Sequence, residues 1–255
     1  MKTIIKRNSR FNIINDYYEN NILGGSLYPS GFCNLLNSNS WEENSFDTFD
    51  YYENKNKILL DIGGWIGIFT LYSANKFKKV ITFEPDKIAF KMLSDNVKCN
   101  NFDNIILNEK AVSNQNGKSK FGGNGVLGNS MSSLIDNEVT LRDMDNIIEI
   151  DTIKLDDYLI EKKIINDIGL IKIDIEGGEY SLIKGIRDYF DTYKPNLYIS
   201  IHHQFLSKNQ IFELIDILFT IYNKCAYFKN RQRIIVTKEE VKNDYINLCE
   251  LVFEA

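Results

Sequence analysis

Two apolar runs that end in polar residues constrain the fold of this chain more than any other feature. The first run, residues 58–62, carries an acid at Asp61 and continues into a glycine turn. The second run ends at Glu84, 23 residues after Asp61. This spacing is typical of a β-α-β unit, in which a tight turn follows the first strand and a carboxylate ends the second. The pattern therefore predicts an open α/β sheet with a ligand crevice at the carboxyl ends of its strands.

Three glycines form the turn after the first run: Gly63, Gly64 and Gly67. Glycine permits positive φ and lets a ligand approach bare backbone, and the N-terminal end of the helix predicted over 66–77 favours a negatively charged group. Asp61 would repel a pyrophosphate but could accept hydrogen bonds from an ammonium group. S-adenosyl-L-methionine carries an ammonium and a carboxylate, and Glu84 could bind its ribose. These residues therefore favour that cofactor over NAD, unless the glycines only shape the turn.

Composition indicates one soluble domain with embellishments. The chain has 255 residues and a net charge of −5, and no basic block suggests a nucleic-acid partner. We expect no membrane span, because no apolar run is long enough. Four cysteines lack metal-ligand spacing, which favours reduced thiols and a cytoplasmic location: Cys33, Cys99, Cys225 and Cys249. Residues 1–50 lack a strong period and are expected to pack on or cap a main domain over 51–255.

From residue 57, strand and helix patterns alternate, which predicts a Rossmann-like, mostly parallel sheet with helices on both faces. Seven strands are expected, at 57–62, 79–83, 104–109, 168–174, 196–201, 224–228 and 247–253. Helices are expected at 66–77, 86–100, 178–190 and 208–222. Residues 229–233 have the composition of a polar turn, so the last strand should close the sheet as an antiparallel hairpin. The glycine-dense insertion 113–157 is either a substrate loop or plain surface variation, with an edge strand at 149–155.

A second group of polar residues follows the later strands. Asp174 and Glu176 end a buried strand, and the only two histidines, His202 and His203, end the next one. The carboxyl ends of parallel strands meet at one rim, so these residues should lie near Gly63 and Glu84. An imidazole there could act as a general base, bind a substrate hydroxyl or bind a divalent metal with Asp174. Alternatively, Glu176 and the following Glu179 only cap a helix.

Together these blocks resemble the FkbM-type family of S-adenosylmethionine-dependent methyltransferases. The resemblance spans roughly residues 57–205 and lies in the Asp61–Gly67 turn, Phe83-Glu84-Pro85, Lys110-Ala111-Val112-Ser113, Leu155-Asp156-Asp157-Tyr158-Leu159 and the segment from Lys172 to Glu179. Two departures stand out. Gly64-Trp65 replaces the usual Ala-Asn of the turn, and His202-His203 lies where relatives more often carry an acid.

The resemblance implies a class I methyltransferase fold and methyl transfer to an oxygen, commonly a hydroxyl of a sugar or natural product. By position, Asp61, Gly63 and Gly67 would hold the methionine portion of the cofactor and Glu84 its ribose. Ala111 would lie near the adenine. The implied partner is a small-molecule or glycan acceptor, and a homo-oligomer is compatible with the sequence.

A more distant similarity, to metal-dependent sugar O-methyltransferases, implies a metal site. By that analogy Asp174, His202 and His203 would be ligands and Glu176 the base, with His203 as a second candidate base. Imidazole ligands suit manganese, iron or zinc better than magnesium. Two other functions stay open at this point. They are an NAD-dependent oxidoreductase and a non-catalytic nucleoside-binding module, and the acceptor itself is left undetermined.

Overall fold

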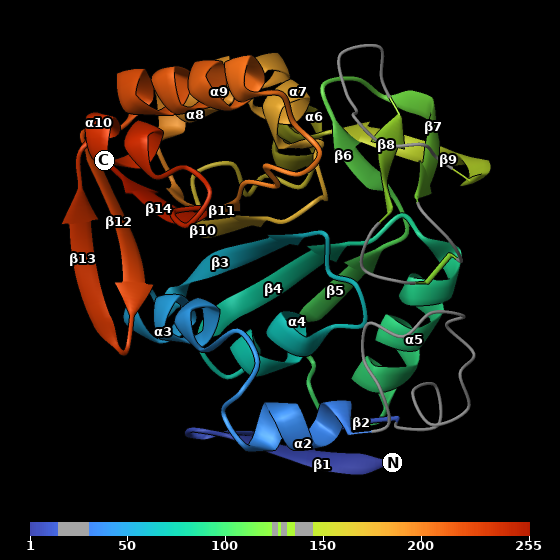
Figure 1. Ribbon diagram of the computed structural model, residues 1–255. Helices are drawn as coiled ribbons and strands as arrows, with labels where there is room; N and C mark the ends of the chain where they lie inside the picture. The colour runs from blue at the N-terminus through green and yellow to red at the C-terminus, as the bar shows by residue number, and fades with distance from the viewer. Residues whose placement is uncertain (15–30, 124–126, 129–131, 136–144) are drawn as a thin grey trace.

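The centre of the protein is a mixed sheet of eight strands (Figure 1). It is seen in a computed structural model that describes residues 1–14, 31–123, 127–128, 132–135 and 145–255. The strand order is β13-β12-β14-β11-β10-β3-β4-β5. In chain order these strands are β3 (Asn54–Ile62), β4 (Phe77–Phe83), β5 (Ile105–Asn108), β10 (Ile168–Ile173), β11 (Asn196–Ser200), β12 (Lys224–Lys229), β13 (Gln232–Val236) and β14 (Glu250–Glu254).

The direction of the strands confirms the predicted Rossmann-like α/β class with a reversed last strand. The pairs from β5 through β4, β3 and β10 to β11 are all parallel. Strand β14 runs antiparallel to both β11 and β12, between which it lies. The sequence analysis expected seven strands, whereas this sheet has an eighth, β13. It was missed because Asn230 and Arg231 both take positive φ, 51° and 66°, and turn β12 directly into an antiparallel partner.

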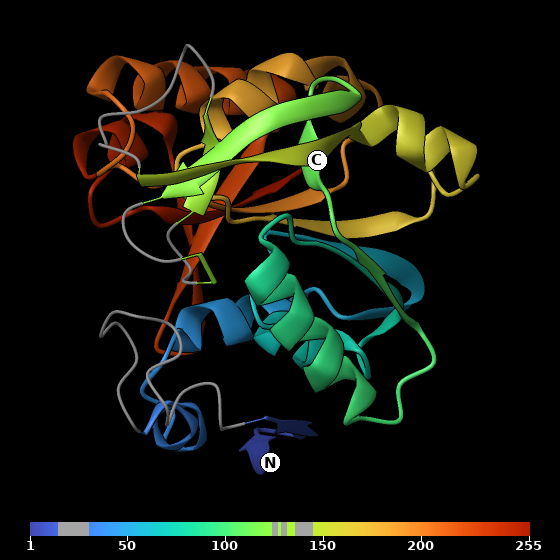
Figure 2. The ribbon, with the colours of Figure 1, turned by 90° about the vertical axis from the view of Figure 1, so that its right-hand side faces the viewer.

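Helices cover both faces of the sheet, which explains why the central strands are continuous apolar runs. Figures 1 and 2 show α6 (Leu155–Glu161), α7 (Glu179–Gly185), α8 (Arg187–Tyr193) and α9 (Lys208–Ile221) on one face. The opposite face carries α3 (Glu43–Tyr51), α4 (Ile68–Ser73) and α5 (Lys87–Lys98). A short α10 (Lys238–Asn243) packs beside α9. The helix predicted over 66–77 is shorter in the structure, where α4 has six residues.

Successive residues of a central strand serve two separate cores. Leu60 and Ile171 belong to the cluster that includes Leu214 of α9. Their neighbours Leu59 and Leu170 belong to the cluster on the other face. All five side chains are fully buried. This alternation follows from the two-residue period of a strand.

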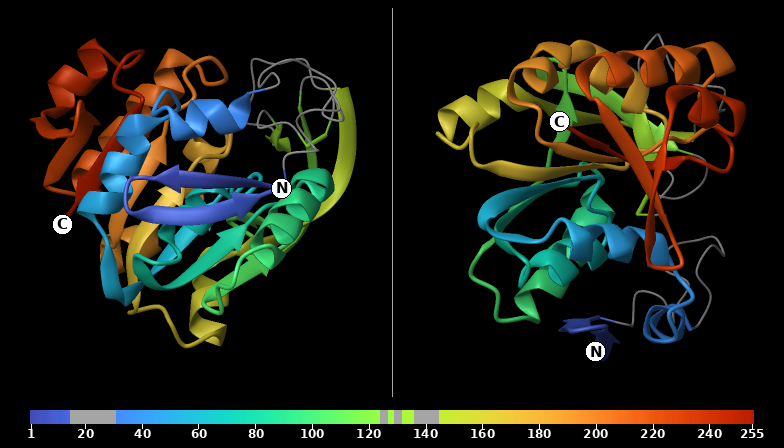
Figure 3. Two further views of the ribbon diagram at one scale, coloured as in Figure 1. Left: turned by 90° about the horizontal axis from the view of Figure 1, so that it is seen from below. Right: turned by 90° about the vertical axis from the view of Figure 1, so that its left-hand side faces the viewer.

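The N-terminal extension is more regular than the sequence suggested. It contains a hairpin of β1 (Lys2–Lys6) and β2 (Ser9–Ile13), followed by α2 (Phe32–Asn37) and α3. Figure 3 shows the hairpin beyond the helices on the lower face of the sheet. The buried ammonium of Lys6 forms an ion pair with Glu43 at the start of α3 and donates a hydrogen bond to the carbonyl oxygen of Leu36. A hydrogen bond of 2.9 Å between the hydroxyls of Ser45 and Tyr198 joins α3 to β11 of the main sheet.

The segment expected as an irregular insertion forms a second sheet in its described part. Its strands are β6 (Ala111–Ser113), β7 (Gly117–Gly123), β8 (Ser132–Ile135) and β9 (Asp145–Lys154), in the order β6-β9-β7-β8. The strand expected at 149–155 is present as part of β9, but its expected place at an edge is wrong, because β9 has a partner on each side. Glycines in β7 do not prevent pairing, since Gly122 and Gly123 face serines of β8 in an antiparallel ladder.

Two further observations concern the cysteines and the helices among the described residues. All four cysteines are free thiols. No described helix has both the length and the apolar character needed to cross a bilayer.

Candidate active site

A cavity of about 360 Å³ lies at the carboxyl ends of β3, β4, β10 and β11. This volume falls within the range of small-molecule pockets. Its walls also include residues of the N-terminal extension, of β8 and of the start of β14. The position agrees with the rule that open α/β sheets bind ligands beyond the carboxyl ends of their strands.

The glycine turn after β3 is forced by close packing between two strand ends. Gly63 has a φ of +82°, and a Cβ on it would lie 1.9 Å from the backbone oxygen of Asp174. A Cβ on Gly64 would meet a side chain of β4, and one on Gly67 a side chain of α5. Gly63 and Gly64 line the cavity, whereas Gly67 is not among its lining residues. The glycines are therefore explained by the protein's own packing, in addition to any ligand approach.

Asp61 lies beneath the cavity rather than on its surface. Its side chain is fully buried and accepts a hydrogen bond of 2.6 Å from the hydroxyl of Thr70. The ammonium of Lys172 lies 3.2 Å from its other oxygen. Lys172 also lies 3.4 Å from Asp174, and both are cavity-lining residues. The ammonium beside Asp61 in the structure is that of Lys172, and a contact of Asp61 with a ligand ammonium stays a prediction from the sequence.

The environment of Lys172 keeps it charged. Burial opposes the charged form, but the neighbouring carboxylates of Asp61 and Asp174 outweigh it and raise the pKa of Lys172 above its ordinary value. Sequence reasoning did not single out Lys172. The available signal was its place two residues before Asp174 on a buried strand, where an unpaired lysine is rare.

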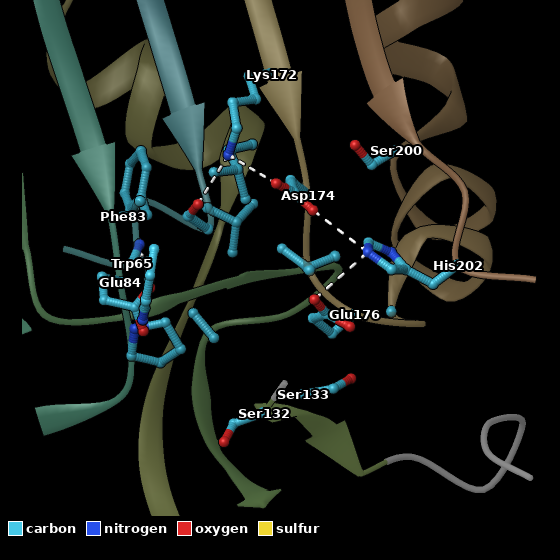
Figure 4. A pocket seen from close by; sticks show the side chains of 18 of the residues that line it. Trp65, Phe83, Glu84, Ser132, Ser133, Lys172, Asp174, Glu176, Ser200 and His202 are labelled. Carbon is cyan, nitrogen blue, oxygen red and sulfur yellow. Dashed lines mark hydrogen bonds and ion pairs between the residues drawn. The ribbon is translucent and has the colours of Figure 1, made fainter. Parts of the chain in front are cut away.

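Glu84 directly follows β4 and lines the cavity on the wall that faces His202 (Figure 4). Only 7% of it is exposed, and its oxygens accept hydrogen bonds of 2.8 Å from the backbone N–H groups of Trp65 and Asp86. Burial raises the pKa of Glu84 to about 8. Burial therefore favours the protonated carboxyl group, which can donate as well as accept a hydrogen bond.

The adenine side expected from the sequence holds Ala111, which is buried and lines the same cavity. Gly128, in a turn between β7 and β8, is bonded to both halves of the first β-α-β unit. The indole of Trp65 donates a hydrogen bond of 3.1 Å to the carbonyl oxygen of Gly128, and the N–H of Gly128 donates one of 2.6 Å to Asp86. Trp65, a departure from the family pattern, thus has a structural partner in the connection between β7 and β8.

Three side chains after β10 and β11 converge on the wall facing Glu84. The Nε2 atom of His202 lies 3.5 Å from an oxygen of Asp174 and 3.5 Å from an oxygen of Glu176 (Figure 4). One ligand atom from each of the three lies within 4.8 Å of the others, a spacing that can hold a metal ion. Glu176 has a φ of 55°, a strained conformation for a non-glycine residue that is often found at functional sites.

Charge around His202 favours its protonated form. Burial lowers the pKa of the imidazole, but the carboxylates of Glu179, Glu176 and Asp174 outweigh that effect and raise the pKa to about 10. In the absence of a metal these carboxylates favour the protonated ring, which cannot act as a base. The carboxylates of Asp174 and Glu176 remain as candidate bases in this group, and Asp174 already pairs with Lys172.

His203 lies on the cavity wall but outside this three-residue group. Its Nδ1 atom is buried and has no hydrogen-bond partner within the described ranges. The metal set expected from the sequence was Asp174, His202 and His203. The structure instead groups Asp174 and His202 with Glu176, because consecutive residues at a strand end point in different directions.

The cavity includes residues that sequence reasoning did not identify. Trp41 and Glu42 come from the extension, Ser132 and Ser133 from β8, and Glu250 from β14. Burial and nearby Asp174 raise the pKa of both Glu42 and Glu250, that of Glu250 to about 7. No periodicity marks these residues, and their meeting depends on how distant segments pack.

Comparison with protein-family models identifies the family of this chain. The family model described as the methyltransferase FkbM domain matches residues 61–229. "Methyltransferase 1" of Beauveria bassiana is 26% identical over 145 residues, which cover 51% of this chain and 58% of that protein. An uncharacterised protein of Methanocaldococcus jannaschii is 30% identical over 115 residues, 45% of this chain and 44% of the other. The chain thus spans about half the length of these curated relatives.

Solved structures with similar folds include a methyltransferase FkbM from Methylobacillus flagellatus. It shares 20% identity, covers 78% of this chain and 44% of its own, and gives a TM-score of 0.48. A Streptococcus mutans protein crystallised with SAH shares 11% identity, covers 84% of this chain and 97% of its own, and gives a TM-score of 0.46.

Proposed function

This chain belongs to the FkbM methyltransferase family, and we propose that it transfers a methyl group from S-adenosyl-L-methionine to a hydroxyl group of a sugar, glycan or sugar-containing metabolite. The observation that carries the proposal is the single cavity shared by two sets of residues. Gly63, Glu84 and Ala111 line one side, and Asp174, Glu176 and His202 line the other. A methyl donor and an acceptor hydroxyl can therefore meet in one enclosed space.

The cofactor side fits a nucleoside with a charged tail. Backbone at Gly63 and Gly64 is exposed to the cavity, and the carboxyl group of Glu84 can bind two ribose hydroxyls. Asp61 would act on the methionine end indirectly, by holding Lys172 below the turn. When bound, S-adenosyl-L-methionine supplies a methyl group already activated by a sulfonium.

On the acceptor side the chain must remove a proton, because a hydroxyl is a weak nucleophile at neutral pH. The carboxylate of Glu176 would take that proton from the acceptor hydroxyl. The ring of His202 can orient both Glu176 and Asp174, since Nε2 lies 3.5 Å from an oxygen of each. Trp41, Ser132 and Ser133 supply the aromatic and hydroxyl groups that commonly surround a sugar.

The same three side chains could hold a divalent metal. Two carboxylates and one imidazole form a mixed oxygen and nitrogen donor set, which suits manganese, iron or zinc better than magnesium. A metal there would lower the pKa of the acceptor hydroxyl. Asp174, Glu176 and His202 would be its ligands, with His203 left on the wall.

Two measurements test the proposed function. Thermal-shift assays with S-adenosylhomocysteine and with NAD should show stabilisation by the first alone. Mass spectrometry of candidate sugars and glycans incubated with the protein and S-adenosyl-L-methionine should show products heavier by one methyl-for-hydrogen exchange. Stabilisation by NAD without stabilisation by S-adenosylhomocysteine would overturn the proposal in favour of an oxidoreductase.

A further inference from the structure

Glu179 is a buried acid that the proposed chemistry has not yet used. It is the first residue of α7, and none of it is exposed to solvent. An acid is almost never fully buried unless its oxygens are paired. Here Oε1 accepts hydrogen bonds from the backbone N–H groups of Ile175, at 3.3 Å, and Gly177, at 3.1 Å. Both donors precede α7, so Glu179 holds the loop after β10 rather than capping the helix.

The third partner of Glu179 is a side chain of the active site. Its Oε1 lies 2.8 Å from Nδ1 of His202. A carboxylate accepts hydrogen bonds and cannot donate them, so the proton of this bond must lie on Nδ1. The other ring nitrogen, Nε2, is thereby turned toward Asp174 and Glu176. The ring is also stacked on Phe205, with ring centroids 6.2 Å apart and planes 24° from parallel.

We infer that Glu179 is a positioning residue of this enzyme, which fixes the ring of His202 so that Nε2 faces the two carboxylates of the cavity. The inference rests on the proposed methyl transfer and adds a residue that does not line the cavity. Carboxylates that orient a histidine in this way are common behind metal sites and catalytic histidines. Loss of Glu179 leaves the stacked ring without a fixed orientation, and the 3.5 Å approaches of Nε2 are lost with it.

Nuclear magnetic resonance can test the positioning role of Glu179 without an acceptor substrate. The chain contains only two histidines, so protein labelled with ¹⁵N-histidine gives two sets of ring signals, and His203 serves as the internal reference. In the wild type, the Nδ1 proton of His202 should be protected and strongly hydrogen-bonded. Glu179→Met should abolish that signal and leave the His203 signals in place. An unchanged His202 signal in Glu179→Met would overturn the inference.

Glu179→Gln serves as the conservative variant, because a carboxamide oxygen in the place of Oε1 can still accept the hydrogen bond from Nδ1 of His202, although Gly177 loses Oε2 as a second acceptor. It should keep the protected proton even if Glu179→Met folds poorly. In a methylation assay, Glu179→Met should lower kcat by about 10- to 100-fold with little change in the KM for the cofactor, and Glu179→Gln should recover most of that loss.

A double-mutant comparison separates positioning from mere structural support. In a His202→Ala background, Glu179→Met should cost little further activity, since Glu179 acts through His202. Fully additive losses would overturn the inference and assign Glu179 to the loop alone. If no acceptor is ever methylated but the histidine signals change as described, the positioning role stands and the proposed function fails.

Discussion

The ammonium of Lys172 lies 2.8 Å from the backbone carbonyl oxygen of Gly63 and donates a hydrogen bond to it. This bond joins β10, which carries the acids, to the turn after β3, which is expected to hold the cofactor. Lys172 and Asp61 are also direct neighbours in the parallel pairing of the two strands. One buried cation thus fixes the distance between the two halves of the cavity.

Replacement of Lys172 by methionine should destabilise the protein by about 3–5 kcal/mol, because buried Asp61 would lose its cation. Chemical denaturation followed by circular dichroism measures the change. Lys118→Met is the control, since that lysine makes a solvent-exposed ion pair with Glu149 and should leave the midpoint almost unchanged. Equal midpoints for the Lys172→Met variant and the wild type would contradict the role assigned to Lys172.

Substitution of Gly63 by alanine should cost on the order of 4 kcal/mol, because the new Cβ would overlap the backbone of Asp174. Gly117→Ala separates this overlap from backbone strain. Gly117 also has a positive φ, +136°, but nothing lies within 4 Å of its Cβ position. A loss of about 1 kcal/mol is expected there. If both variants lose the same stability, the close approach of the two strand ends is not what requires glycine.

The raised pKa of Glu84 predicts a pH dependence. Since the folded pKa of about 8 exceeds the ordinary value of 4.5, the folded state binds the proton more tightly than the unfolded state. This stabilisation is complete below about pH 4.5 and is lost as the pH rises through 8. Glu84→Gln imitates the protonated group, so the free energy of unfolding of this variant should decline less over that window.

The difference between the wild-type and Glu84→Gln curves of unfolding free energy against pH gives the contribution of Glu84 alone. The contribution of Glu250, whose raised pKa acts in an overlapping range, cancels in this difference. Parallel curves would show that Glu84 titrates normally. Calorimetry with S-adenosylhomocysteine adds a second measurement on this residue. Glu84→Ala should weaken binding, because the ribose would lose its hydrogen-bonding partner.

Glu176→Gln should lower kcat by about 10²- to 10⁴-fold through loss of the base, with the affinity for S-adenosylhomocysteine nearly intact. His203→Ala is expected to reduce turnover as well, through its buried Nδ1 at the cavity wall. Glu161→Gln, at an exposed carboxylate of α6, is the control. Unchanged turnover in both cavity variants would remove them from the catalytic group.

Metal dependence can be measured directly. Incubation with a chelator should abolish methyl transfer, and added Mn²⁺ should restore it. Electron paramagnetic resonance of Mn²⁺ should detect binding in the wild type and much weaker binding in Asp174→Asn and His202→Ala, because each variant removes one of the grouped ligands. Full activity in the presence of the chelator would show that methyl transfer needs no metal. Asp174 and His202 would then act only through proton transfer or through their charge.

Sequence alone was enough for the central strands, because residues 58–62 and 168–174 are apolar runs that both faces of a parallel sheet require. Two elements could not be read in this way. Strand β13 follows a turn at Asn230-Arg231 that lacks the usual glycine. The second sheet includes glycines that were read as loop, although cross-strand pairing with β8 supports them as strand residues.

For the site, sequence placed the strand-end residues at one rim but could not assign their partners. Asp61 faces Lys172 only because the two strands pair in one register. The structure places Glu176, and not His203, in the group with His202. This placement depends on the path of the loop that Glu179 holds. Glu42 and Glu250 reach the cavity from segments far away in the chain, for which no local pattern exists.

The walls of the cavity come from separate stretches of chain, and this has an evolutionary consequence. Trp41 and Glu42 belong to the N-terminal extension, whereas the glycine turn and Glu84 belong to the first β-α-β unit. Under the proposed function, Trp41 and Glu42 form a wall of the cavity that can vary in sequence while the glycine turn and Glu84 stay constant. Directed evolution toward new acceptors would best begin by randomising this pair.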